Sequence, residues 1–123
     1  MLGIQHHVAI TCSNYQRSLE FYEKLGFTVL RRAWREAHQD YLTMLRCGEI
    51  TLELFEDPHA PQQPNSSQLG LRHLAFRVEN VEETAAQLNG MGIETEPIRE
   101  DKINGGRLTF FRDPDGLPLE LHE

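Results

Sequence analysis

An internal repeat constrains this chain more than any other feature. When the 123 residues are shifted by 66 positions, His7-Val8-Ala9-Ile10 aligns with His73-Leu74-Ala75-Phe76. One extra residue in the second copy raises the offset to 67, and Leu52-Glu53-Leu54 then aligns with Leu119-Glu120-Leu121. Eleven residues are identical over about fifty aligned positions, about three times the number expected by chance, and their order is the same. The chain is therefore predicted to consist of two equivalent modules.

Both modules have the same predicted order of elements. Module one covers about residues 1–56 and module two about 70–123, with a proline-rich linker over 57–69. Alternating apolar residues predict strands, and an amphipathic stretch with Asn near its start and Gly beyond its end predicts one helix per module. The result is an α+β fold, βαβββ twice. The strands are expected at 5–12, 27–35, 39–46, 49–56, 72–78, 93–99, 106–112 and 117–122, and the helices at 14–25 and 80–89.

Composition and charge exclude several classes of protein. The chain is 39% hydrophobic, enough for a packed core, and its net charge of −7 disfavours nucleic acid or an anionic membrane as partner. No apolar run is long enough to span a bilayer, and no signal peptide is expected. The two cysteines do not make a disulfide framework. A cytoplasmic location is therefore expected.

Strand alternation places two histidines and two glutamates on comparable faces. Successive side chains of a strand point to opposite faces, so His7 and His73 oppose the apolar residues of their strands. Glu53 and Glu120 do the same in the last strand of each module. Two imidazoles and two carboxylates suit a divalent metal such as Zn²⁺, Ni²⁺, Co²⁺ or Mn²⁺. One such residue alone is more often structural or solvated, but their recurrence at equivalent positions favours a metal site.

These motifs resemble the vicinal oxygen chelate superfamily, and within it the glyoxalase I type. The resemblance covers nearly the whole chain and implies a single domain, 1–123, whose two modules form a curved mixed sheet. It also implies one divalent metal, Zn²⁺, Ni²⁺ or Co²⁺, and a set of four ligands: His7, Glu53, His73 and Glu120. The residues that carry it are 7–10, 25–27, 52–55, 72–76, 111–116 and 119–121.

The resemblance implies a metal-dependent lyase or isomerase. Its substrate would be the hemithioacetal of an α-oxoaldehyde and a thiol, or a similar small vicinal-oxygen compound, and the reaction would pass through an enediolate. Glu120 is implied as the base, with Glu53 as its symmetric partner. Extradiol dioxygenases and fosfomycin-modifying thiol transferases instead use two His and one Glu. Relatives commonly build the site across a homodimer, so a homodimer is expected, although the linker allows the modules to pair within one chain or between two.

Two departures concern the substrate. Thr11 and Asp57 stand where glutathione-using relatives carry Arg and Asn, which weakens any grip on glutathione carboxylates. Arg77, symmetric with Thr11, either replaces that cation or is a solvated strand arginine. His122 lies two residues from Glu120 and is expected to help orient it. The alternative is a non-catalytic metal- or small-molecule-binding or resistance protein on the same fold. The residues expected to bind substrate are Thr11, Arg77, Phe55 and Asn104.

Overall fold

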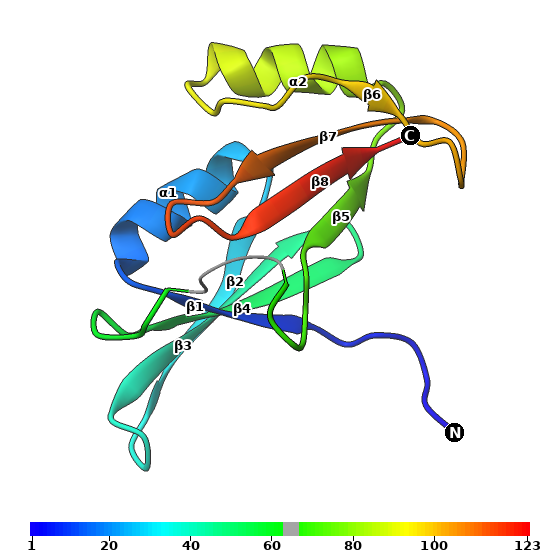
Figure 1. Cartoon of the computed structure of the whole chain (residues 1–123). Coiled ribbons are helices and arrows are strands. Elements are labelled where there is room, and N and C mark those ends of the chain that lie inside the picture. The colour runs from blue at the N-terminus through cyan, green and yellow to red at the C-terminus, as the bar shows by residue number, and fades with distance from the viewer. Residues whose placement is uncertain (63–66) are drawn as a thin grey trace. The chain divides into compact units, whose positions relative to one another are not determined.

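The chain divides into two compact units, Met1–Pro61 and Gln62–Glu123, which are module one and module two below. The structure is a computed structural model and describes residues 1–62 and 67–123 (Figure 1). The division falls inside the predicted linker, whose residues 63–66 lie outside the described part. The α+β class and the repeated element order are confirmed.

Module one is a four-stranded mixed sheet with one helix. Its strand order is β1-β4-β3-β2; β1 and β4 are parallel and the other neighbours are antiparallel. The strand expected at 5–12 begins at Val8, and Ile4, which precedes it, is 98% exposed. Residues before His6 cannot pair with β4, because β4 begins at Ile50, which is opposite position 6 in this register. The elements are β1 Val8–Cys12, α1 Tyr15–Lys24, β2 Thr28–Arg35, β3 Asp40–Cys47 and β4 Ile50–Glu56.

Module two repeats this topology with the order β5-β8-β7-β6, again with its first and last strands parallel. The strands therefore hydrogen-bond as two sheets of four, one in each module. Neither helix is long and apolar enough to cross a membrane in the part of the chain that is described. The elements are β5 Leu74–Arg77, α2 Val81–Gly90, β6 Arg99–Glu100, β7 Arg107–Arg112 and β8 Pro118–His122.

The strand predicted over 93–99 is wrong. Only Thr95 forms a bridge there, to Phe111, and β6 is two residues long. Pro97 lies between them and has no amide hydrogen to donate to a neighbouring strand, so the ladder cannot continue through it. Module one has no proline at the equivalent place, and its β2 runs for eight residues.

The extra residue of the second copy lies in the final hairpin turn. Arg46 pairs with Thr51 in module one, whereas Arg112 pairs with Pro118 in module two. The longer turn is stabilised by Asp113, whose Oδ1 accepts the amides of Asp115 and Leu117 at 2.9 and 2.8 Å. The insertion therefore leaves the strand register around Glu53 and Glu120 unchanged.

The repeated asparagines and glycines cap the two helices. The Oδ1 atoms of Asn14 and Asn80 accept backbone amides in the first helical turn, at 2.9 and 3.0 Å. Gly26 and Gly92 follow the helix ends with φ of 99° and 81°, a conformation that favours glycine. Each helix packs an apolar stripe on its own sheet. The buried residues of the helices are Ser18, Phe21 and Tyr22 in α1 and Val81, Ala85 and Leu88 in α2.

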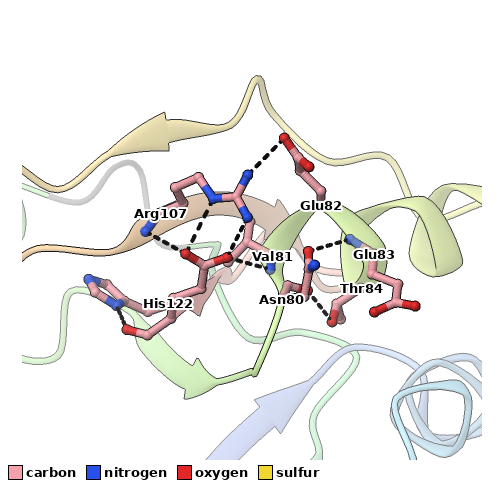
Figure 2. A network of polar contacts seen from close by, with 8 residues as sticks. Asn80, Val81, Glu82, Glu83, Thr84, Arg107 and His122 are labelled. Atoms are coloured by element: carbon pink, nitrogen blue, oxygen red, sulfur yellow. Dashed lines mark hydrogen bonds and ion pairs between the residues drawn. The ribbon is translucent and has the colours of Figure 1, made fainter.

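The repeated pair Glu56 and Glu123 ties the end of each last strand to the first turn of each helix. Glu56 accepts the amide of Tyr15 at 2.6 Å, and Glu123 accepts that of Val81 at 3.1 Å. Glu123 also binds Arg107, which is labelled in Figure 2 and whose Nη2 donates to Glu123 Oε1 at 2.9 Å. Arg107 lowers the pKa of the Glu123 carboxyl to about 2. A negative charge at a helix N-terminus is favourable, which accounts for the presence of Glu at this position in both modules.

Glu123→Gln is therefore expected to lower the melting temperature more than Glu56→Gln does, because Glu56 has no arginine partner among the described contacts. The pKa of Glu123 is lower in the folded chain than its ordinary 4.5, so its stabilising contribution is complete above that pH. It is lost as the pH falls toward 2. Thermal unfolding of wild type and both variants between pH 2 and 7 measures this. Equal melting curves at neutral pH would contradict it.

Candidate metal and catalytic site

His7 and Glu53 meet on the face of the module-one sheet opposite its apolar core. Ala9 of β1 lies beside Glu53 of β4 in a parallel register, and His7 is two residues earlier, on the same face. His7 Nε2 lies 3.2 Å from Glu53 Oε2. The Glu53 side chain is only 12% exposed, so it has little water to solvate its charge. The other ring nitrogen of His7, Nδ1, lies 2.9 Å from Nδ1 of the exposed His6.

His73 and Glu120 reproduce this arrangement in module two. Ala75 lies beside Glu120 in the same parallel register, and His73 Nε2 is 2.8 Å from Glu120 Oε2. The Glu120 side chain is 9% exposed. The predicted set of four is thus found as two His–Glu pairs, each formed within its own module.

Each His–Glu pair fits half of a metal site. Two ligand atoms that each lie about 2.1 Å from one ion are about 3 to 3.4 Å apart, depending on the ligand angle. The nitrogen–oxygen distance in module one lies within this range, and that in module two is slightly shorter. A largely buried carboxylate also requires a cationic or hydrogen-bonding partner. In the described ranges 1–62 and 67–123, no three His, Cys, Asp or Glu side chains come close enough to hold an ion together. Within those ranges each pair supplies two ligand atoms, one nitrogen and one oxygen.

Arg35 lies beside the module-one pair and was missed in the sequence. Its guanidinium carbon is 4.5 Å from the centre of the Phe55 ring, and two of its nitrogens donate to Asp40 at 2.7 and 2.6 Å. These hydrogen bonds raise the pKa of Arg35 and lower that of Asp40. Arg35 and Asp40 pair at the end of the β2–β3 hairpin, and their opposite charges on either side of the predicted turn could have indicated this ion pair. Phe55 is thereby covered on one side.

Phe110 lies beside the module-two pair and was also missed. It is opposite Glu120 in the β7–β8 register, and its ring meets the His73 ring edge to face, with centroids 5.0 Å apart. Edge-to-face contacts of this geometry are favourable. The strand alternation over 108–112 could have placed it on this face. The guanidinium carbon of Arg99 lies 5.6 Å from the centre of the Phe110 ring.

The described hydrogen bonds of His122 do not include Glu120. They connect its ring to the backbone of Glu123 and to Asp101, in the loop before β7. Its Nδ1 lies 2.6 Å from the carbonyl oxygen of Glu123, and its Nε2 lies 3.0 Å from Asp101 Oδ2. Both nitrogens thus face acceptors, and the hydrogen bond to Asp101 is the main cause of a raised His122 pKa. Asp101 also accepts the backbone amides of Ile103 and Asn104, and these contacts lower its pKa.

The four residues expected to bind substrate occupy different environments. Thr11 and Arg77 are exposed on β1 and β5, and Phe55 is half-buried on β4. Asn104 is exposed in the loop, where its side-chain amide donates to Asp101 at 3.1 Å. Register pairs Thr11 with Phe55 in one module and Arg77 with His122 in the other.

Residues 4–121 match the family model of the glyoxalase/bleomycin resistance protein/dioxygenase superfamily. The chain belongs to this superfamily. Uncharacterized protein YwkD of Bacillus subtilis is 48% identical, over 96% of this chain and 94% of its own length. Uncharacterized protein YaeR of Escherichia coli is 42% identical, over 100% and 99%. The crystal structure of a glyoxalase family protein from Enterococcus faecalis superimposes with a TM-score of 0.91 at 54% identity, covering 98% and 97%.

More distant relatives in this superfamily are named as enzymes. A 2-epi-5-epi-valiolone epimerase of Actinomyces is 33% identical over 94% of this chain and 76% of its own length. Glyoxylase I 4 of Arabidopsis thaliana is 28% identical, over 94% and 68%. Glutathione transferase FosA of Serratia marcescens is 31% identical, over 99% and 82%. Superfamily members are therefore often enzymes, and they typically use a divalent metal.

Proposed function

We propose that the protein is a metal-dependent lyase or isomerase of the glyoxalase type. Its substrate would be an α-oxoaldehyde–thiol hemithioacetal or a similar small molecule with oxygens on adjacent carbons. The observation that carries the proposal is the repeated His–Glu pair, with nitrogen–oxygen distances of 3.2 and 2.8 Å at equivalent register positions. The presence of both acids, Glu53 and Glu120, favours this class over relatives that use a single Glu.

In this proposal His7, Glu53, His73 and Glu120 hold one divalent ion, Zn²⁺, Ni²⁺ or Co²⁺. The ion supplies Lewis acidity toward the two substrate oxygens. Glu120 takes the proton from one carbon and returns it to the next, and Glu53 is the equivalent acid of module one. Both side chains are largely buried, which keeps bulk water from competing for that proton. Phe110 holds the ring of His73, so that its Nε2 faces Glu120.

Non-catalytic binding of a metal or small molecule is the second candidate, and residue 57 favours it. Asp57 Oδ1 accepts the amide of His59 at 3.0 Å, so this position serves a turn and adds negative charge. Glutathione-using relatives carry Arg and Asn at these two positions, and neither Thr11 nor Asp57 can replace them in binding glutathione. A thiol other than glutathione, or no thiol, is then expected.

A turnover assay separates the two candidates. The chain, loaded in turn with Ni²⁺, Co²⁺ or Zn²⁺, is mixed with methylglyoxal and one of several thiols, and product formation is followed by absorbance. We expect turnover with at least one thiol, slower with glutathione than with a smaller thiol. The metal-free chain is the control. Absence of turnover with every metal–thiol combination would leave the binding protein as the function.

The proposal includes a homodimer and a cytoplasmic location. Relatives that complete their site across two chains motivate the homodimer, and each module here supplies two of the four ligands. Cys12 and Cys47 are not joined in a disulfide, which accords with a reducing compartment.

A further inference from the structure

The two modules differ in charge at one pair of neighbouring positions beside the ligands. Thr11 and Phe55 lie next to each other in module one, and Arg77 and His122 occupy the same places in module two. In each module this pair of residues lies two positions further along the strands than the glutamate, Glu53 or Glu120, and on the same face of the sheet. The modules have kept the same ligand types but not the same neighbours. The difference therefore concerns what lies beside the metal ligands and not the ligands themselves.

Arg77 keeps an uncompensated positive charge. It is exposed, and in the described ranges 1–62 and 67–123 no hydrogen bond or ion pair of its side chain is found. Glu120, on the adjacent strand, is engaged with His73 at 2.8 Å. Asp101, the acid near His122, is held by the ring of His122 at 3.0 Å and by two amides of its own loop. The acids of this face are thus occupied by other partners.

The wider charge distribution agrees with this. The chain carries a net charge of −7, yet register places six of its ten arginines on the two faces that bear the His–Glu pairs. A face that carries more arginines than carboxylates attracts small anions, even on a protein whose net charge is negative. The six are Arg31, Arg35, Arg46, Arg77, Arg99 and Arg112.

We propose that Arg77 binds an oxyanion of the substrate, a carboxylate or a phosphate-type group, at a subsite bordered by His122. The inference rests on the proposed function and assigns its substrate class: a small anion whose charged end lies toward module two. His122 lies beside Arg77 in the β5–β8 register, and its ring holds Asp101 at 3.0 Å.

Titration of the full-length chain with small probes tests the subsite without turnover. Backbone amide shifts are recorded as methylphosphonate, acetate or neutral N-methylacetamide is added to wild type, Arg77→Gln, Arg77→Lys and Arg46→Gln. Arg46→Gln is the matched control, since it removes the same charge from the equivalent face of module one. Methylphosphonate and acetate distinguish the two oxyanion classes, and the neutral probe measures binding that does not depend on charge.

We expect the better-bound anion to shift the amides of residues 75–78 and 120–122, with a Kd at least about fivefold higher in Arg77→Gln. Arg77→Lys should restore part of the affinity, and Arg46→Gln should match wild type. Equal binding by wild type and Arg77→Gln, or equal weakening by Arg46→Gln, would overturn the subsite. Failure of the proposed function would appear only in the turnover assay, so the two outcomes are distinguishable.

Discussion

Glu120→Gln is expected to lower kcat by at least about a hundredfold while the metal content stays near that of wild type. A positioned acid–base group contributes about 10²- to 10⁴-fold to a rate, and an amide cannot take up a proton. Gln keeps the volume and one oxygen of Glu120, so the side chain can still lie beside His73 in its 9% exposed position. Steady-state kinetics with the best metal–thiol pair, together with elemental analysis of the same samples, measure both quantities.

Two further variants complete this experiment. Glu49→Gln removes an exposed carboxylate between β3 and β4 and should leave kcat unchanged. Glu53→Gln should lower kcat less than Glu120→Gln, if Glu120 is the base. Wild-type turnover in Glu120→Gln would contradict the assignment of the base. Loss of both metal and activity would leave Glu120 as a ligand only.

His7→Ala and His73→Ala are each expected to lower metal affinity by more than about a hundredfold, although 66 residues separate them. Changes in residues that merely orient a ligand already cost 10- to 100-fold, and loss of the ligand itself should cost more. The two losses of affinity should be similar, because each variant removes one nitrogen ligand from the same ion. Calorimetric titration with Zn²⁺ or Ni²⁺ measures the affinity, and elemental analysis should find about one ion per chain in wild type.

His59→Ala serves as the control for metal binding. His59 is exposed in the turn after β4, and its described hydrogen bond is donated by its backbone amide, which alanine keeps. Its affinity should equal that of wild type. Full metal content in both ligand variants would mean that the repeated His–Glu pairs are a relic of duplication, and the proposed activity would then lose its support.

The elements that could be predicted are those whose cause is local. Asn14 and Asn80 cap helices through contacts three residues away, and Gly26 and Gly92 end them, so short-range spacing was sufficient. Alternation in the last strands also placed Glu53 and Glu120 on the face opposite the core. The strand expected over 93–99 does not form as predicted, because Pro97 interrupts the ladder between Thr95 and β6.

The sequence by itself determined the repeat, the order of the elements and the four residues of the His–Glu pairs, because strand periodicity and short-range capping depend on neighbours along the chain. Only the tertiary structure decided which groups meet across strands. The contact of Phe110 with His73, the placement of Arg35 over Phe55 and the capture of Asp101 by His122 all depend on register between strands far apart in sequence. Register is set by hydrogen bonding and core packing of the whole sheet, which periodicity within one strand does not encode.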